Sequence, residues 1–232
     1  MHEFSTFSME KSNSSFEDIL QQIFPIDVRH NTLKRTFDVV FSIFTLLMLL
    51  PFFCIIALII ISTSQGPIFY GHKRIGRGGR IFKCYKFRTM YKDADSRLND
   101  LLTNHPSLKQ EWEKTHKLKS DPRITPIGAF LRKTSLDELP QFWNVIVADL
   151  SIVGPRPVVE EEIERHIGVK AAKILSIRPG ITGLWQTSGR SNTSYAYRVA
   201  LDEQYVDQHS FFFDIKLILK TIPCILFSRG AY

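Results

Sequence analysis

Cysteine is scarce in this 232-residue chain, and its three copies lie far apart. Cys54, Cys84 and Cys224 have no ligand-like spacing, which excludes a disulfide scaffold and a cysteine-based zinc site. The glycine spacings of Walker and dinucleotide-binding loops are also missing, so a P-loop enzyme is excluded. With 23% charged and 44% hydrophobic residues, the chain is neither wholly disordered nor a polytopic membrane protein, and its length fits one domain with a small appendage at most.

Negative charge is absent from a long stretch, because no Asp or Glu occurs between Asp38 and Asp93. The formal net charge of +7 therefore comes from one local block rather than from a chain that is basic throughout. A block of this kind favours the cytoplasmic side of a membrane or another anionic partner. Its members are Lys73, Arg74, Arg77, Arg80, Lys83, Lys86, Arg88 and Lys92.

The same stretch begins with a long apolar run, Val39–Ile61, in which only Ser42 and Thr45 are polar. A straight helix over this run is about 35 Å long, enough to cross a hydrocarbon core of roughly 30 Å. No small-residue cleavage site follows it, so a signal peptide is not expected. A helix buried in a globular core is the alternative, although such helices are rarely apolar over this length.

Pro51 lies at the middle of the run and argues against a straight span. It removes one helix hydrogen bond and clashes with the preceding turn, which leaves two apolar segments of a length typical of a re-entrant insertion. Basic residues flank the run on both sides, with Arg29, Lys34 and Arg35 before it, so both ends are expected on the cytoplasmic side. The sequence favours a re-entrant helix broken at Pro51, with a proline-kinked spanning helix as the alternative.

The remainder predicts a small, mostly helical α+β domain. Thr125 followed by Pro126 is typical of a helix start, and this helix is expected to run to about Lys133. The other expected elements are strands at Ile68–His72 and Ile81–Met90 around a turn at Gly76–Gly79, a polar helical stretch at Ala94–Lys117 broken at Pro106, and helices from Asp137, at Val158–Ile167 and at Ser194–Asp207.

The expected division of the chain is a mobile, serine-rich polar tail (1–32), the re-entrant membrane helix (33–63), a cytoplasmic catalytic domain (64–209) and a C-terminal interfacial helix (210–232). The last of these rests on Phe211–Phe227, an apolar run that Asp214, Lys216 and Lys220 interrupt and Pro223 bends. An amphipathic helix in the headgroup region fits this pattern. A core helix packed under the domain is the alternative.

An acidic pair, Asp137-Glu138, is the most informative feature of the domain. Ser135 lies three residues before Glu138, the spacing of a capping box; a cap at Asp137 is the alternative, because it places Pro140 inside the first turn. In both cases the pair begins a helix, where free N–H groups and the helix dipole keep Asp137 ionised. An ionised Asp137 can act as a nucleophile or a metal ligand, although such a pair is most often only an acidic helix start.

Two proline- and glycine-rich turns carry arginine. Arg156 stands between two prolines, and Arg178 and Arg190 bracket a glycine-rich loop. Rigid turns that bear arginine suit bidentate binding of phosphate. Two carboxylates that face such arginines indicate a phosphate ligand with a divalent metal between them.

Five ordered motifs, Lys34–Asp38, Tyr85–Met90, Ser135–Gln141, Ser151–Pro157 and Arg178–Gly183, carry a family resemblance. From Leu33 to Tyr232 the sequence resembles the bacterial sugar transferases, the monotopic polyprenyl-phosphate phosphoglycosyl transferases. Phe82–Met90 and the ending Arg229–Tyr232 make it most similar to the short members that begin exopolysaccharide synthesis with galactose or glucose. One departure is Leu50, where many members carry a serine whose hydroxyl helps to satisfy the broken helix.

The resemblance implies transfer of a hexose 1-phosphate, galactose or glucose, from a UDP-sugar to undecaprenyl phosphate, with release of UMP. It implies that Asp137 forms a covalent phosphosugar-aspartate, that Glu138 is its partner, and that both hold Mg²⁺. It also implies the cytoplasmic face of the bacterial inner membrane, with membrane lipid as a partner and Pro51 at the break of the re-entrant helix. The basic substrate-binding positions that it implies are Lys86, Arg88, Arg132, Arg156 and Arg190.

A membrane-tethered scaffold is the competing hypothesis, in which the basic block Lys73–Lys92 binds anionic lipid or nucleic acid. That hypothesis gives the acidic pair and the arginine-bearing turns no role, so no nucleic acid partner is expected. The identity of the sugar, the polysaccharide and the formation of a homodimer are not decided by the sequence.

Overall fold

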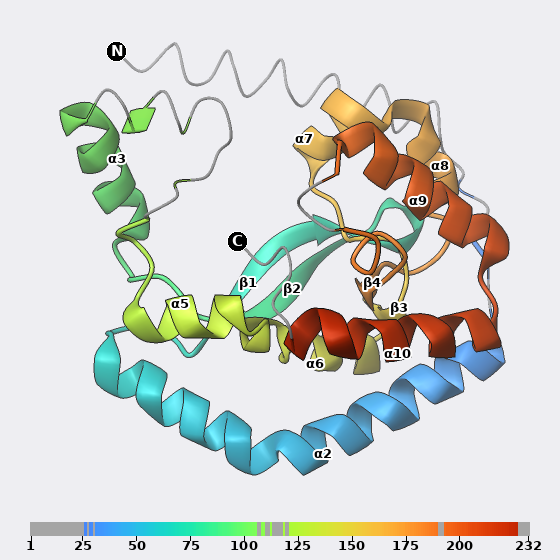
Figure 1. Ribbon diagram of the computed structural model, residues 1–232, viewed down its shortest axis with the longest axis horizontal. Coiled ribbons are helices and arrows are strands. Elements are labelled where there is room, and N and C mark those ends of the chain that lie inside the picture. The colour runs from blue at the N-terminus through green and yellow to red at the C-terminus, as the bar shows by residue number, and fades with distance from the viewer. Residues whose placement is uncertain are drawn as a thin grey trace.

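The computed structural model describes Ile26 and residues 28–29, 31–105, 108–109, 112, 118, 121–189 and 193–226. Most of the tail at 1–32, the break at Pro106, Arg190 and the last residues of the chain, 227–232, lie outside the described residues. The described part is mostly helical with two small sheets, which confirms the predicted α+β class (Figure 1).

The elements follow one another from the long N-terminal helix to a C-terminal helix that lies beside it (Figure 1). The strands are β1 (Phe69–Ile75), β2 (Ile81–Phe87), β3 (Ser151–Val153) and β4 (Gly180–Thr182). The helices are α2 (Thr32–Thr63), α3 (Ala94–Asn104), α5 (Pro126–Lys133), α6 (Gln141–Ile146), α7 (Glu160–Glu162), α8 (Ala171–Ile174), α9 (Tyr195–Gln208) and α10 (Phe211–Leu226).

α2 is the predicted membrane helix, and in the described part of the chain it alone is long and apolar enough to cross a membrane. It contains Pro51, and Figure 1 shows that it bends near its middle, so that both arms point back toward the rest of the molecule. Much of its surface is uncovered, with Val40, Leu47, Met48 and Leu58 each more than 60% exposed. An apolar surface of this size requires a partner other than water.

Both arms of α2 pack against the domain. In the first arm, Phe41 packs on the core cluster that includes Val145. In the second arm, Ile56 and Ile60 are buried in a cluster with Phe87 of β2. The bend therefore lies between two arms that are attached to the same body.

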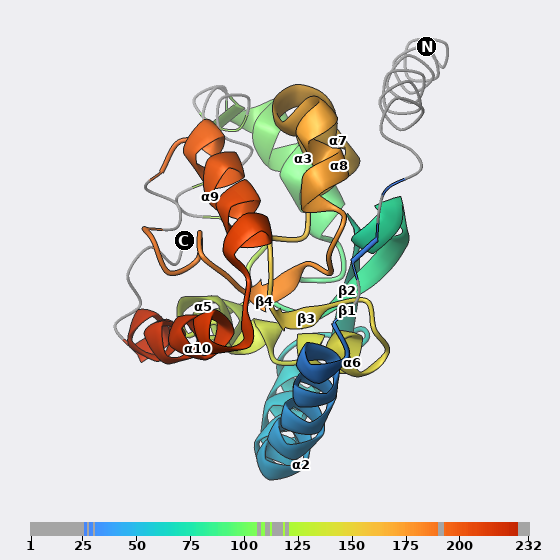
Figure 2. The same cartoon turned by 90° about the vertical axis from the view of Figure 1, so that its right-hand side faces the viewer.

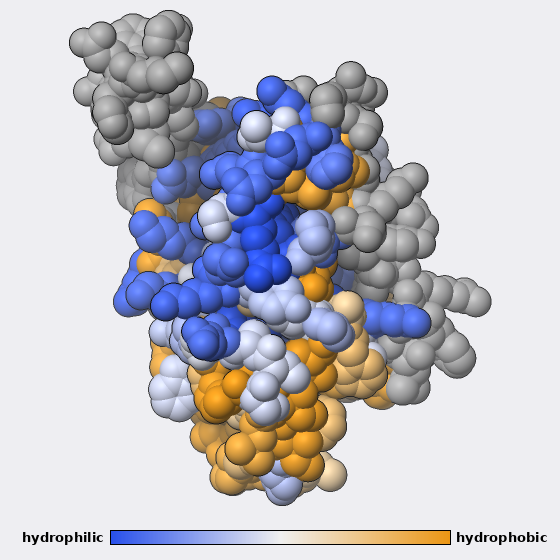
Figure 3. Space-filling view, turned by 90° about the vertical axis from the view of Figure 1, so that its left-hand side faces the viewer, coloured by the Kyte–Doolittle hydropathy of each residue, from blue (hydrophilic) through white to orange (hydrophobic). Residues whose placement is uncertain are grey.

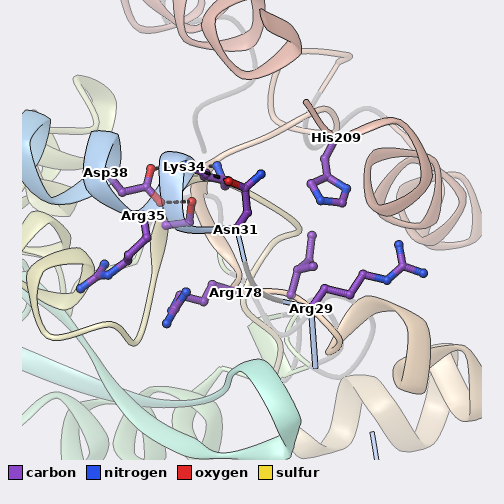
Figure 4. Close-up of a pocket in the computed structure, with 9 residues that line it drawn as sticks. Arg29, Asn31, Lys34, Arg35, Asp38, Arg178 and His209 are labelled. Carbon is purple, nitrogen blue, oxygen red and sulfur yellow. Dashed lines mark hydrogen bonds and ion pairs between the residues drawn. The ribbon is translucent and has the colours of Figure 1, made fainter. Parts of the chain in front are cut away.

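Polar contacts also hold the first arm of α2 (Figure 4). Lys34 Nζ lies 2.6 Å from Asp214 Oδ2, and Ser151 Oγ donates to Asp38 Oδ2 at 2.6 Å. Arg35 donates to two carbonyl oxygens at the end of α6, at 2.6 and 2.8 Å. Four of these residues line a cavity of about 50 Å³. The motif Lys34–Asp38 thus joins α2 to β3, α6 and α10.

Of the two sheets, the sequence predicted the first and missed the second. β1 and β2 form the expected antiparallel hairpin, with Ile75 opposite Ile81 and Gly78 at a φ of 68° in the turn, although β2 ends at Phe87 rather than at Met90. β3 and β4 pair in parallel, with Ser151 opposite Gly180. That second sheet was not predicted, because strands of three residues carry no alternating pattern.

Two predicted helix starts are confirmed by their caps. Thr125 Oγ1 accepts a hydrogen bond from Gly128 N at 2.9 Å at the start of α5. Ser194 Oγ accepts one from Tyr197 N at the start of α9. The helix expected at Val158–Ile167 is present as α7 followed by a π-helical turn at Ile163–Ile167.

α5, α6 and α10 lie at one level, on the side of the molecule from which α2 projects (Figures 1 and 2). Each exposes apolar side chains: Phe130 on α5, Trp143 on α6, and Phe212 and Leu219 on α10. Leu217 of α10 is buried, so one face of this helix packs on the domain while another is uncovered. Figure 3 shows hydrophobic side chains gathered at the α2 end of one face of the molecule and hydrophilic ones over most of the remainder.

Candidate active site

The acidic pair lies in a 3₁₀ turn, Leu136–Glu138, and not in the first turn of an α-helix. The predicted helix from Asp137 is wrong, because α6 begins only at Gln141 after Pro140. Ser135 makes no capping hydrogen bond and has a φ of 57°, so the capping box is not formed. Pro140 instead stands at the N-cap of α6, so the chain makes a 3₁₀ turn at Leu136–Glu138 before the α-helix begins at Gln141.

Lys86 of β2 brings a positive charge to the pair. Its Nζ lies 2.6 Å from Glu138 Oε1 and 3.5 Å from Asp137 Oδ2. Asp137 is buried, with 7% of its surface exposed, whereas the Glu138 side chain is 35% exposed. The two carboxylates thus share one ammonium group but differ in their access to solvent.

The surroundings of Asp137 act on its charge in opposite directions. Burial raises the pKa of Asp137 above its ordinary value, and the charge of Glu138 adds to this, whereas Lys86 and Arg132 lower it. Burial alone would lower the pKa of Lys86, but the charges of Glu138 and Asp137 outweigh it and raise that pKa. The cations, and not an α-helix dipole, therefore favour the ionised form of Asp137.

Arg132 and Arg88 were both predicted to bind substrate, and the structure places them differently. Arg132 Nε donates to Thr89 Oγ1 at 2.9 Å, and its charge acts on Asp137. Arg88 is buried and donates to the backbone oxygens of Ser64 and Pro67 at 2.6 and 2.7 Å, at the end of α2. Arg132 therefore belongs to the surroundings of the pair, whereas Arg88 holds the second arm of α2.

A second group of charges lies beside the first. Burial raises the pKa of the Cys84 thiol to about 11, and the charges of Lys86, Glu138, Arg74 and Arg156 all act on it. Arg156, a predicted substrate-binding residue, therefore acts on the same thiol as Lys86 and Glu138, and its charge also lowers the pKa of Lys86. Arg190, the remaining predicted position, lies outside the described residues.

Arg156 stands among residues that sequence reasoning missed. Asp202 Oδ1 accepts a hydrogen bond from its backbone N at 3.4 Å, and its guanidinium lies 5.3 Å from the centre of the Trp185 ring. Arg198 of α9 lies at the same distance from that ring, and Glu162 is 3.0 Å from Arg198 Nη1. Their spacing along the sequence gave no signal, since only Arg198 and Asp202 are close neighbours in the chain.

The acidic pair supplies only two protein ligands for a metal ion, so a bound metal would need phosphate oxygens of the substrate as further ligands. Among the described residues, no group of three or more His, Cys, Asp and Glu side chains is placed to hold one. Mg²⁺ commonly binds one or two carboxylates and completes its shell with water and substrate phosphate oxygens. Asp137 and Glu138 supply such a pair, so the residues fit a Mg²⁺ that is shared with a phosphate ligand.

Comparison with known proteins shows the family of the chain. Residues 29–228 match the model of a family described as bacterial sugar transferase. The chain belongs to the bacterial sugar transferase family. It is therefore an enzyme, a phosphoglycosyl transferase, and the predicted resemblance is confirmed.

Several curated bacterial sugar transferases are similar to the chain. Exopolysaccharide production protein ExoY of Rhizobium meliloti is 49% identical over 86% of the chain and 88% of its own length. Undecaprenyl-phosphate galactose phosphotransferase of Salmonella typhimurium is 48% identical over 86% of the chain, and UDP-glucose:undecaprenyl-phosphate glucose-1-phosphate transferase of Escherichia coli is 34% identical over 90%. The matched part is 42% and 43% of the length of these two proteins.

Proposed function

We propose that this phosphoglycosyl transferase moves a hexose 1-phosphate from a UDP-sugar to undecaprenyl phosphate, releasing UMP, in the first membrane step of exopolysaccharide synthesis. The observation that carries the proposal is the buried Asp137 beside Lys86 and Glu138, in a domain attached to both arms of an apolar helix. The names of the relatives cited above support galactose or glucose as the sugar and a polyprenyl phosphate as the acceptor.

The proposed reaction has two steps at one phosphorus. A carboxylate oxygen of Asp137 attacks the β-phosphorus of the donor, the bond to the bridging oxygen breaks, and UMP leaves with that electron pair. A phosphate oxygen of the lipid then attacks the same phosphorus and frees Asp137. Lys86 and Arg132 neutralise charge around the reacting groups, and Mg²⁺ held by Asp137 and Glu138 would supply further stabilisation of the diphosphate charge.

The proposed topology is a re-entrant α2, with the domain on the cytoplasmic face of the bacterial inner membrane. Both arms of α2 are attached to one domain, through Phe41 on the first arm and Ile60 on the second. A spanning α2 would have to detach one arm. The exposed apolar residues of α5, α6 and α10 support a domain that rests on the bilayer, with the side chains of Phe130, Trp143 and Phe212 in the interface.

Release of UMP tests the reaction. Purified full-length protein in detergent or nanodiscs, given Mg²⁺, undecaprenyl phosphate and a panel of UDP-hexoses, should release UMP with one of them. Incubation with that donor alone should add the mass of a hexose phosphate to the peptide that contains Asp137. No turnover with any UDP-hexose would contradict the proposed donor and the proposed reaction.

Asp137→Asn is the matched variant, because it keeps the shape of the side chain and removes its nucleophilic oxygen. We expect both the mass adduct and UMP release to disappear, with at least a 10³-fold loss of rate, the order of magnitude for losing a covalent nucleophile. Substantial residual turnover in this variant would remove Asp137 from the nucleophile's role.

A further inference from the structure

A groove of about 630 Å³ lies beside the end of the second arm of α2, and no residue of the acidic pair or its surroundings lines it. One wall is the last turn of α2 with the residues that follow it, Ile61–Gln65. The other wall is the segment before α3, Tyr91–Asp93, together with Arg97 of α3. A volume of this size is typical of small-molecule sites, so the groove can hold a group as large as a phospholipid headgroup.

The groove lies at the depth where the proposed topology puts the lipid headgroups. α2 is apolar up to Ile61, whose side chain is 56% exposed, and polar from the next residue on. Figure 1 shows this end of α2 close to the level of α5, the helix whose exposed Phe130 is proposed to rest in the interface. A ligand in the groove can therefore keep its polar part among polar residues while its apolar part follows α2 into the bilayer.

The charged residues of the groove leave one positive charge without a counterion. Arg97 Nε lies 2.9 Å from Asp93 Oδ2, and the guanidinium lies 4.2 Å from the centre of the Tyr91 ring. Lys92 is exposed and makes no ion pair within the part of the chain that the structure describes. Arg97, Lys92 and Asp93 are the charged residues among those that line the groove. Its net charge is therefore +1, which fits a ligand with one negative charge.

The wall formed by α2 offers hydrogen-bond acceptors. Ser62 Oγ and Thr63 Oγ1 both donate to the carbonyl oxygen of Ile59, at 3.0 and 2.7 Å. Each hydroxyl oxygen keeps lone pairs that can accept a hydrogen bond. The ligand should therefore carry donors as well as a negative charge. The hydroxyl groups of a glycerol headgroup are such donors, whereas the quaternary ammonium of choline has no N–H.

We propose that this groove binds the headgroup of one anionic phospholipid, a phosphodiester with a hydroxyl-bearing alcohol such as glycerol. Lys92 contacts the phosphate, the headgroup hydroxyls donate to Ser62 and Thr63, and the acyl chains follow Ile61 along α2. The bound lipid holds the second arm of α2 at the depth of the headgroups. The inference rests on the proposed membrane topology and goes beyond the proposed reaction, because the groove takes no part in the transfer.

Native mass spectrometry of the full-length protein in detergent, titrated with phosphatidylglycerol, tests the site. One phosphatidylglycerol should bind more tightly than phosphatidylcholine with the same acyl chains, and inorganic phosphate should not displace it. Lys92→Gln should weaken this binding about fivefold, the effect of one cation near an anionic lipid surface, whereas Lys92→Arg should retain it. Ser62→Trp, which fills the groove without a change of charge, should abolish the preference for phosphatidylglycerol.

Lys73→Gln is the matched control, because it removes the same charge from another exposed position of the basic block. It should leave the affinity for phosphatidylglycerol unchanged. Equal binding of the two lipids, displacement by inorganic phosphate, or the same loss in Lys73→Gln as in Lys92→Gln would overturn the site. Release of UMP by the wild type is measured separately and without added phosphatidylglycerol, so a failure of the lipid site is distinguished from a failure of the proposed reaction.

Discussion

In the proposed reaction Asp137 attacks phosphorus only after it has lost its proton, and its surroundings partly oppose that loss. Burial raises its pKa above the ordinary 3.8, and Lys86 is the strongest influence in the other direction. A raised pKa means that the neutral acid persists to higher pH, so the rate of adduct formation should fall as the pH falls through that raised value. In a plot of this rate against pH, the fall on the acidic side (the acid limb) should therefore lie above pH 3.8.

Removal of the Lys86 charge should move this limb. In Lys86→Met the lowering influence is lost, so the pKa of Asp137 rises further and the acid limb of single-turnover adduct formation shifts to higher pH. Lys83→Met is the control, because Lys83 lies on the same strand with an exposed side chain. An acid limb that does not move in Lys86→Met would show that Lys86 does not set the protonation of the nucleophile.

Arg88 offers a test of a structural role against the substrate-binding role that the family resemblance implies. Its guanidinium closes the end of α2 through Ser64 and Pro67, and hydrogen bonds from a charged donor contribute about 1.5–3 kcal/mol each. Arg88→Met should therefore lower the free energy of unfolding in detergent by about 2–3 kcal/mol, whereas Arg80→Met, at an exposed position, should not. A raised KM for the donor without a loss of stability would instead support substrate binding.

At the scale of single elements, predictions succeeded where the signal is local. Thr125 before Pro126 and Ser194 before α9 mark helix starts through their own side chains. β3 and β4 could not be predicted, because the pairing of Ser151 with Gly180 joins residues far apart in the sequence. The turn at Asp137 was misassigned because the sequence offers two capping patterns there, whereas the α-helix begins later, with Pro140 at the N-cap of α6.

The ion pair between Lys34 and Asp214 should stabilise the attachment of the first arm of α2 to α10. In Lys34→Met, the buried Asp214 loses the ammonium at 2.6 Å and keeps only neutral donors such as Tyr205. Breaking a buried ion pair on one side costs about 3–5 kcal/mol, so unfolding in detergent should occur at clearly lower denaturant concentration. The exposed Lys216→Met on α10 should leave the midpoint unchanged.

The double variant Lys34→Met/Asp214→Asn completes the thermodynamic cycle. Lys34→Met leaves two buried carboxylates, Asp38 and Asp214, without their shared ammonium group, and the double variant removes one of them. It should therefore recover part of the stability that Lys34→Met loses. If the two single losses simply add, the contact between Lys34 and Asp214 does not hold α2 to α10.

At the scale of the whole molecule, the sequence located the centre of the candidate site but not its extent. Asp137 and Glu138 are adjacent in the chain, and Lys86 and Arg156 lie in recognisable motifs, so these could be named in advance. Arg198 lies in an ordinary helical segment, and only the fold brings it to Arg156. Arg88 shows the converse, because it lies in a recognisable motif while its guanidinium donates to the backbone of Ser64 and Pro67 at the end of α2.

The proposed membrane topology predicts on which side of the membrane the two ends of the chain lie. Reporter tags fused at Met1 and at Tyr232 should both report the cytoplasm, because both arms of α2 are attached to one domain. A single-pass membrane protein with the same two tags is the control that reports opposite sides. Tags of this protein on opposite sides would make α2 a spanning helix and would require one arm to leave the domain.

The bend of α2 affects how the activity should depend on the thickness of the bilayer. A helix that crosses a bilayer must match its thickness, and a mismatch costs free energy for each ångström. In the proposed re-entrant topology α2 turns back halfway and does not meet the distant leaflet, so the depth of the domain is set by the near headgroups alone. Activity in vesicles should then change little between short-chain and long-chain phospholipids, provided that the near surface stays the same.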